Sequence, residues 1–213
     1  MKTNIAVIGG GGYAKVIISI IKQIEEYNLV GYTDLSDKGE ILGIPYLGDD
    51  DKFIAESNKF SVNEIVLGVG QLQNSSIKQK IVSRFKENGF KFPKIISPTA
   101  IVREGVTIGE GTIIRDGAII SSSTRIGNFS IIGTSVSISY DSIIGNNTNI
   151  SLGSNVGINV SIGSNVLIGM GTTVMNNKKI ADNCLVGAGS LIIKDCLDKG
   201  VYFGAPAKKI KDL

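Results

Sequence analysis

Every sixth residue from Ile96 to Ile192 is isoleucine or valine, without a break in phase. A period of six fits neither an amphipathic helix, which repeats about every 3.6 residues, nor a half-buried strand, which alternates every two. It is typical of a parallel β-helix, in which each hexapeptide forms one flat face and turns one aliphatic side chain inward. Three such faces close a triangular coil of about 18 residues. The positions in phase are Ile96, Val102, Ile108, Ile114, Ile120, Ile126, Ile132, Ile138, Ile144, Ile150, Val156, Ile162, Ile168, Val174, Ile180, Val186 and Ile192.

The first part of the chain follows a different pattern. Short apolar runs predict buried strands, and helical spacing of apolar residues predicts two helices. The predicted elements are strands at residues 4–8, 29–33 and 65–69 and helices from Tyr13 to about Glu26 and over residues 75–88. A strand, a helix and a strand with a glycine-rich turn between them predict a small Rossmann-like βαβ unit.

These two patterns predict two domains. Residues 1–92 are expected to form the α/β Rossmann-like domain, and residues 93–213 the parallel β-helix. After Ile192 the six-residue pattern ends, and the tail is expected to cap the last coil, because an exposed coil end is a sheet edge. A short prism of this kind has flat outer faces and a modest core, so we expect three chains to pack as a closed homotrimer.

Composition excludes several classes of protein. Hydrophobic residues make up 42% of the 213 residues but aromatic residues only 6%, which suits a core of stacked isoleucine and valine. The net charge of +3 comes without a long basic run, so no nucleic acid partner is expected. The apolar run Ile5–Ile8 is too short for a membrane span or a signal peptide. Cys184 and Cys196 are expected on different faces of a coil, so a disulfide between them is not expected, and a reducing cytoplasm fits.

The glycine-rich turn is the first candidate for chemistry. Gly9, Gly11 and Ala14 match the pattern G-x-G-x-x-G/A between a predicted strand and a predicted helix. Glycines let the backbone approach a phosphate, and the start of a helix offers free N–H groups to an anion. Asp34 ends the next strand and is placed to accept a hydrogen bond from a ribose or a base. The alternative is a tight turn that only packs the helix on the sheet, and the short domain favours one nucleoside diphosphate over a dinucleotide.

Four segments resemble those of a known family. The chain is similar to the bacterial sugar O-/N-acyltransferases with a left-handed β-helix, of the sialic acid O-acetyltransferase and UDP-bacillosamine N-acetyltransferase type. The likeness covers nearly the whole chain. The segments that carry it are Gly9–Val16, Ile44–Gly48, Ser97–Ala100 and Gly204–Lys208.

The resemblance implies a ligand for each domain. The N-terminal domain is expected to bind a nucleotide-linked sugar, and acetyl-CoA is expected as cosubstrate, without a metal, in a groove between neighbouring β-helices of the trimer. The substrate-binding residues implied are Gly9, Gly11, Gly12, Tyr13 and Asp34. The cofactor-binding residues implied are Gly157, Ile158, Asn176, Ala188 and Lys208.

The chain departs from the family in one respect: it contains no histidine. The catalytic Glu-His-Asp of the family is matched by Ser139-Tyr140-Asp141, and a second family histidine is matched by Asn149. Tyr13 and Ser97 also stand where the family usually has histidine. The catalytic residues that the resemblance implies are therefore Asp141, Tyr140 and Asn149, of which only Asp141 is the family's own residue.

The missing histidine bears on the kind of acceptor. A sugar hydroxyl needs a general base, and a tyrosine with a pKa of about 10 is a poor one. A sugar amine with a pKa of roughly 8 is partly neutral and attacks a thioester without a strong base. We therefore expect an N-acyltransferase for a nucleotide-linked amino sugar. The alternatives are an O-acetyltransferase for a sialic-acid-like sugar and a trimer that has lost catalysis but still binds a sugar nucleotide.

Overall fold

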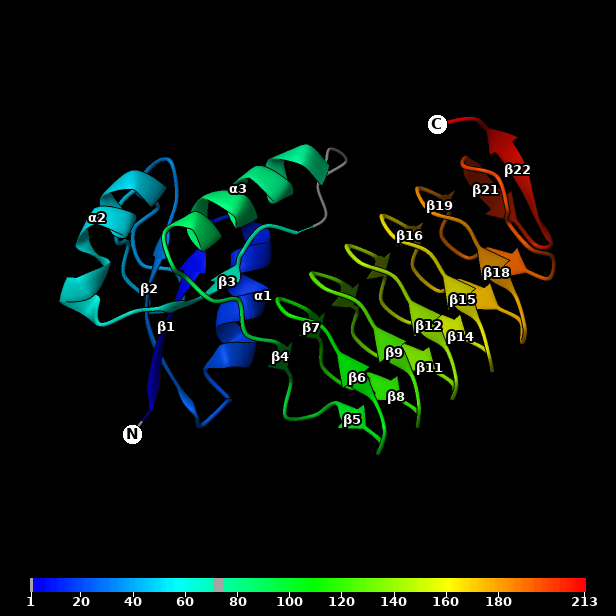
Figure 1. Ribbon diagram of the computed structural model, residues 1–213, viewed down its shortest axis with the longest axis horizontal. Coiled ribbons are helices and arrows are strands. Elements are labelled where there is room, and N and C mark those ends of the chain that lie inside the picture. Colours follow the sequence, from blue (N-terminus) through cyan, green and yellow to red (C-terminus); the bar gives the residue numbers. More distant parts are fainter. Residues whose placement is uncertain (1, 71–74) are drawn as a thin grey trace. The chain divides into compact units, whose positions relative to one another are not determined.

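The computed structural model describes residues 2–70 and 75–213. The chain forms two compact units, Met1–Pro98 and Thr99–Leu213, each of which is described by itself (Figure 1). Among the helices of these described residues, none combines the length and the apolar character that crossing a bilayer requires.

The first unit is a three-stranded parallel sheet in the order β2-β1-β3, with three helices. Its core consists of the aliphatic strand residues and one side of helix α1, joined by a cluster of aromatic rings around Phe53. The elements are β1 (Thr3–Ile8), α1 (Gly12–Ile21), β2 (Tyr27–Thr33), α2 (Asp50–Phe60), β3 (Glu64–Leu67), α3 (Ser75–Glu87) and the short β4 (Ile95–Ile96).

The predicted βαβ order is confirmed, with two differences in the helices. Helix α1 ends at Ile21, because the N–H groups of Gln23 and Ile24 bond to carbonyls only three residues back and close the helix with tight turns. Helix α2 was not predicted, since Phe53 is its only fully buried residue and its apolar period is weak. The signal that marks its start is Asp49, whose carboxylate accepts from the N–H of Lys52 at 2.8 Å.

The second unit is a parallel β-solenoid, in which short strands stack in three sheets (Figure 1). We name the sheets by their strands. Face I contains β7 (Ile113–Ile114), β10 (Ile131–Ile132), β13 (Asn149–Ile150), β16 (Leu167–Ile168) and β19 (Leu185–Val186). Face II contains β5 (Ile101–Val102), β8 (Ile119–Ile120), β11 (Ser137–Ile138), β14 (Asn155–Val156), β17 (Thr173–Val174) and β20 (Leu191–Ile192). Face III contains β6 (Thr107–Ile108), β9 (Arg125–Ile126), β12 (Ile143–Ile144), β15 (Ser161–Ile162) and β18 (Lys179–Ile180).

Each strand of these faces pairs with the strand of the next coil, 18 residues later, as Ile132 does with Ile150 and Ile150 with Ile168. The second residue of each strand points inward, and all of these from Ile114 to Ile192 are buried. The six-residue pattern of the sequence is therefore confirmed as the inward row of the solenoid. The first residue of each strand points outward.

Three edges join the faces, and each is named by the faces that it connects. Edge I–II contains residues 115–118, 133–136, 151–154, 169–172 and 187–190. Edge II–III contains residues 103–106, 121–124, 139–142, 157–160 and 175–178. Edge III–I contains residues 109–112, 127–130, 145–148, 163–166 and 181–184.

Buried polar groups of the edges form hydrogen bonds with the backbone of the neighbouring coils. At edge III–I the buried Thr148 hydroxyl donates to the Gly163 carbonyl at 2.7 Å and accepts from the N–H of Val166 at 3.2 Å. Glycine is required where two coils touch, since a Cβ on Gly145 would lie 2.4 Å from the carbonyl carbon of Gly163. The edges thus stack backbone against backbone.

The end of the solenoid is a hairpin of β21 (Val201–Gly204) and β22 (Ala207–Lys211). Strand β21 pairs with β19, so it extends face I and satisfies that strand's edge. Near this end of the solenoid, Cys184 and Cys196 are both buried, and neither forms a disulfide. Burial raises the pKa of the Cys196 thiol to about 12, so this thiol stays protonated.

We predict that Gly145→Ala lowers the free energy of unfolding by about 2 kcal/mol or more, because the added methyl group meets the backbone of the next coil. The control is Gly153→Ala, because Gly153 has a φ of +67° and no atom lies within 4 Å of the added Cβ. This variant should lose only about 1 kcal/mol, from the left-handed backbone conformation of alanine. Urea unfolding of both variants measures the difference. Equal losses would contradict close stacking of the edges.

Candidate functional site

The carboxyl ends of β1, β2 and β3 meet at one end of the first unit's sheet. The order β2-β1-β3 places a change of winding direction at β1, which is where α/β sheets bind ligands. The turn after β1 and the turn after β3 touch there, since a Cβ on Gly68 would lie 2.5 Å from the carbonyl oxygen of Gly9. The structure therefore brings the glycine-rich turn to the expected ligand position of the sheet.

The four glycines of this turn are of two kinds. A Cβ on Gly9 would lie 2.9 Å from Val69, and one on Gly10 would lie 2.5 Å from the ring of Tyr32, so the fold requires both glycines. A Cβ on Gly11 or Gly12 would meet nothing within 4 Å. Both residues are exposed at the start of α1, with no side chain capping the helix. Packing within the unit therefore does not explain glycine at these two positions.

Asp34 lies beside the turn as the sequence predicts. Its Oδ2 accepts a hydrogen bond from the N–H of Gly10 at 2.8 Å, and its carbonyl accepts from the Tyr46 hydroxyl at 3.0 Å. The carboxylate is only part-buried. It is thus held in place by the turn while part of it stays open to a ligand.

Two further residues belong to this end of the unit. The ring of Tyr13, in the first turn of α1, lies over Gly70, where a Cβ would be 3.4 Å from the ring. Lys78, in the first turn of α3, was not predicted; burial lowers the pKa of its ammonium group to about 8. The sequence signal was weak, because a single lysine in an amphipathic helix is usually exposed.

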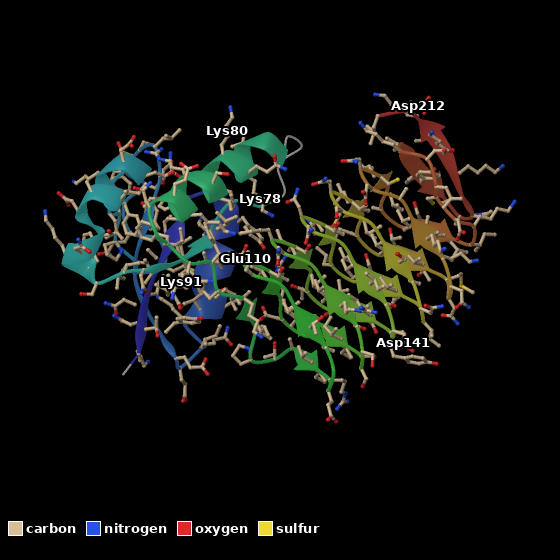
Figure 2. The ribbon with its side chains drawn as sticks, in the orientation of Figure 1. Lys78, Lys80, Lys91, Glu110, Asp141 and Asp212 are labelled. Carbon is tan, nitrogen blue, oxygen red and sulfur yellow. The ribbon has the colours of Figure 1, made fainter. Side chains whose placement is uncertain are left out.

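In the second unit, Tyr140 and Asp141 lie on edge II–III, and Figure 2 shows Asp141 on the outside of the solenoid. Tyr140 is 48% exposed, and Asp141 turns the edge with a φ of +58°. Within the described residues, the carboxylate of Asp141 has no hydrogen bond or ion pair. The edge therefore presents a phenol and a carboxylate side by side to the exterior.

Three of the predicted cofactor residues stand on the same edge. Ile158 follows Tyr140 by one coil and Asn176 follows Ile158 by one more, as shown by the bonds from Asn159 N–H to the Tyr140 carbonyl (3.1 Å) and from Asn177 N–H to the Ile158 carbonyl (2.8 Å). Gly157 precedes Ile158. The structure thus brings the predicted catalytic pair and these cofactor residues into one line along edge II–III.

Two backbone N–H groups along this line already donate hydrogen bonds within the chain. The N–H of Ile158 donates to the Asn176 side-chain oxygen at 2.9 Å, and the N–H of Gly157 donates to the Val174 carbonyl at 2.9 Å. Glycine at 157 makes room for Asn176, whose Oδ1 would lie 2.4 Å from an added Cβ. A ligand along the edge therefore meets side chains and carbonyl groups rather than these two N–H groups.

Asn149 is not brought to Asp141 within one chain. It begins strand β13 on face I, so face III separates it from edge II–III. Its row of outward residues is otherwise aliphatic. This row consists of Ile113, Ile131, Asn149, Leu167 and Leu185.

Ala188 and Lys208 lie at the end of the solenoid, away from Tyr140. Ala188 is on edge I–II, and Lys208 pairs with Phe203 across the terminal hairpin. The Phe203 ring lies against Gly187, where a Cβ would be 2.3 Å from the ring. The predicted cofactor residues therefore form two groups: one lies on edge II–III, and the other is at the end of the solenoid, with Ala188 on edge I–II and Lys208 in the terminal hairpin.

Two family models match the chain. The model described as the PglD N-terminal domain matches residues 4–85, and the one described as bacterial transferase hexapeptide (six repeats) matches residues 159–194. The first covers the sheet and helices of the first unit. The second covers later coils of the solenoid, including part of edge II–III.

Similar proteins match half of the chain or nearly all of it. The chain is 30% identical over 110 residues to UDP-N-acetylbacillosamine N-acetyltransferase of Bacillus subtilis, and this match spans 51% of the chain and 50% of that relative's length. It is 27% identical to the acetyltransferase domain of PglB from Neisseria gonorrhoeae in complex with acetyl coenzyme A, with a TM-score of 0.87 over 99% of this chain and 100% of that one. It is 26% identical to PerB from Caulobacter crescentus in complex with CoA and GDP-perosamine, with a TM-score of 0.76 over 97% of each chain.

Each unit thus contains a match to a family model, and the structural matches extend over nearly the full chain. The chain thus combines a domain similar to the PglD N-terminal domain with hexapeptide repeats similar to those of bacterial transferases, and it resembles solved acetyltransferases over nearly its whole length.

Proposed function

We propose that the protein is an N-acetyltransferase that moves the acetyl group of acetyl-CoA to the amine of a nucleotide-linked sugar. The observation that carries the proposal is the line of Tyr140, Asp141, Ile158 and Asn176 along one edge of the solenoid. One similar protein, which aligns with half of the chain, is named for such a transfer, and two that align with nearly all of it hold acetyl-CoA or CoA with GDP-perosamine. The cytoplasm is the location that we propose for it, where acetyl-CoA is available.

A homotrimer is part of the proposal, and the outward residues support it. The large apolar side chains exposed on edge I–II and the adjoining faces include Leu152 (48% exposed) and Met170 (53% exposed), with Ile101 and Ile119 on face II. Face III carries the charged Arg125 and Lys179, with one exposed apolar residue, Ile143, between them. Burying the apolar edge at a threefold axis removes this surface from water and leaves face III to the solvent.

This packing completes the site. When three prisms meet at edge I–II, face II of one copy lies against face I of the next. Edge II–III of the first copy then stands opposite edge III–I of its neighbour, at the mouth of a groove. Asn149 of the neighbour, the one polar residue in its outward row, comes to the side of Tyr140 and Asp141 that a single chain leaves incomplete.

The chemistry follows from the absence of histidine. The neutral amine attacks the thioester carbonyl, a C–N bond forms, and the C–S bond breaks with CoA leaving as the thiolate. Asp141 accepts the ammonium proton, directly or through water, and Tyr140 donates a hydrogen bond to the carbonyl oxygen on which charge develops. Asn149 of the neighbouring copy orients the acceptor. A hydroxyl acceptor has no base of sufficient strength here, which favours N-acetylation over O-acetylation.

The first unit binds the nucleotide. Gly11 and Gly12 expose their N–H groups at the start of α1 with open space above them, and this space suits the approach of a phosphate. Asp34, held by Gly10, accepts a hydrogen bond from the ribose or the base. Tyr13 forms the wall beside Gly70.

Asp141→Asn is predicted to lower kcat about 10²-fold with little change in the KM for acetyl-CoA, because it removes the proton acceptor and keeps the shape. Tyr140→Phe is predicted to lower kcat less, because a neutral hydrogen bond is lost. Steady-state release of the CoA thiol with UDP-N-acetylbacillosamine and GDP-perosamine measures both. Unchanged turnover in both variants would show that neither residue handles the proton or the oxyanion.

We expect kcat/KM of the wild type to rise with pH up to the pKa of the acceptor amine, roughly 8, with no inflection near the usual histidine pKa of about 6.5. A rate profile from about pH 6 to pH 9 tests this. A plateau that begins near pH 6.5 would require a base that this chemistry does not contain.

Gly12→Ala is predicted to weaken binding of the nucleotide sugar about tenfold or more while the melting temperature stays equal or rises, since alanine suits a helix better than glycine. Gly10→Ala is the matched control, and it lowers the melting temperature because its Cβ meets the Tyr32 ring. Calorimetry with the nucleotide sugar and thermal unfolding separate the two effects. If the Gly12→Ala variant binds the nucleotide sugar as tightly as the wild type, the phosphate does not bind at this turn.

Met170→Glu is predicted to give monomers, because three carboxylates cannot be buried together at the proposed axis. Lys179→Glu, on face III, leaves the trimer intact. Light scattering after size-exclusion chromatography measures both masses. A trimer that persists in the Met170 variant would place the axis elsewhere on the solenoid.

A further inference from the structure

The last part of the chain, which closes the solenoid, carries the net positive charge of the protein. Residues 178–213 contain seven lysines and four aspartates, with no arginine or glutamate. This excess of three positive charges equals the net charge of the whole chain, so the rest of the sequence is balanced. The basic character of the protein is therefore a property of one end of the solenoid.

Two segments border this end. The hairpin of β21 and β22 extends face I beyond β19, and Figure 1 shows it at the end of the solenoid. Residues 193–199 cross the end of face III, because Cys196 pairs with Ile180 of β18, the last strand of that face. We call the exposed side chains of residues 193–199 and 208–213 the terminal surface, since both segments lie beyond the last full coil.

The lysines of the terminal surface are open to solvent, whereas two of its three aspartates are engaged within the chain. Asp212 pairs with Lys209 at 2.7 Å, and Asp195 accepts a hydrogen bond from the N–H of Lys179 at 2.9 Å. The exposed lysines that form no ion pair within the described residues are Lys194, Lys199, Lys208 and Lys211. The terminal surface thus presents positive charge that the described chain does not neutralise.

Large apolar side chains are exposed on the same surface. Leu197 is 65% exposed, Ile210 is 63% exposed and Leu213 is 54% exposed, more than any other large apolar residue of the second unit. Lysines on an edge strand such as β22 also prevent pairing with another chain, but this does not account for an exposed leucine or isoleucine. Apolar side chains gathered at one place on a surface mark an interaction site.

A membrane that contains anionic lipids is the partner whose chemistry matches both features. Its headgroups attract ammonium groups, and the boundary between headgroups and acyl chains takes up aliphatic side chains. A lysine suits this boundary, because its apolar stem lies against the acyl chains while its charge stays at the headgroups. We propose that the terminal surface docks on an anionic membrane, with Leu197 and Ile210 inserted at the level of the headgroups.

The proposed trimer favours a flat partner. Edge I–II runs along the solenoid, so a threefold axis at this edge turns the ends of all three copies to the same side. Three terminal surfaces then bind one membrane together, which converts three weak, salt-sensitive attachments into a firm one. This strengthening rests on the proposed trimer. Docking of a single terminal surface does not, and neither depends on acetyl transfer.

Sedimentation with lipid vesicles tests the role of the charge. We expect binding to phosphatidylcholine vesicles with about one-third phosphatidylglycerol, and binding about tenfold weaker or less to phosphatidylcholine alone. Lys199→Gln combined with Lys211→Gln should weaken binding to the anionic vesicles about tenfold, since each lysine near such a surface contributes about 1 kcal/mol. The matched control is Lys91→Gln combined with Lys94→Gln, which removes two exposed lysines of the first unit and should leave binding unchanged.

A second experiment tests the apolar contact. Leu197→Gln should weaken binding to the anionic vesicles about tenfold, whereas Leu35→Gln, at a leucine of the first unit that is 97% exposed, should not. The chain contains no tryptophan, so Ile210→Trp introduces a single indole. On anionic vesicles its emission should shift to shorter wavelength and be quenched by brominated acyl chains. The emission of Leu35→Trp should show neither change.

Several results would overturn the inference. They are equal binding to both kinds of vesicle, equal binding by the variant that lacks Lys199 and Lys211, and an Ile210→Trp emission that vesicles do not alter. Polyglutamate that binds as tightly as the vesicles would assign the lysines to an acidic protein partner instead. A rise of about tenfold in the KM for acetyl-CoA in the lysine variant would assign them to the cofactor. Vesicle binding needs no acetyl acceptor, so its failure is distinguished from failure of the proposed function.

Discussion

The hydrogen bonds between successive coils are the constraint on which the rest of the second unit depends. Each strand pairs with the strand 18 residues later. At edge glycines such as Gly145, the backbone of the next coil occupies the space that a side chain would need. This spacing leaves no freedom in the direction of stacking. Residues 18 apart must therefore stand in rows, and the line of candidate site residues Tyr140, Ile158 and Asn176 follows from their positions in the sequence.

The same constraint explains what the sequence could predict. A period of six identifies the inward residues directly, and the glycine-rich turn between strand and helix identifies the ligand end of the first sheet. It does not identify which of the three edges would meet another copy in the proposed trimer, because that depends on outward side chains whose pattern has no fixed period. Asn149 illustrates the difference: its match to a family histidine was visible in the sequence, but its separation from Asp141 by a whole face was not. Helix α2 was missed for a related reason, since it buries little and its period is weak.

The sequence also does not show which atoms contact one another once the chain has folded. The turn of residues 9–12 matches a motif that treats its glycines alike, yet Gly10 is required by the Tyr32 ring whereas Gly12 has open space beside it. From the sequence, the N–H of Ile158 is expected to be free to bind a cofactor. In the structure it donates to the side chain of Asn176. In both cases the deciding fact is an atom more than 15 residues away, and only the fold brings it near.

Outward positions on a solenoid contribute little to its stability, so chemistry there can change while the fold stays the same. This accounts for a chain that aligns over nearly its whole length with a solved acetyltransferase domain and contains no histidine. It also gives a way to recognise function without a bound ligand. A residue that differs in kind from its neighbours in the same outward row is a candidate for a role outside the fold, and Asn149 among aliphatic side chains is such a residue. In the proposed trimer, with edge I–II at the threefold axis, the row of Asn149 faces the groove beside the next copy, which is where the proposed acceptor site needs a polar group.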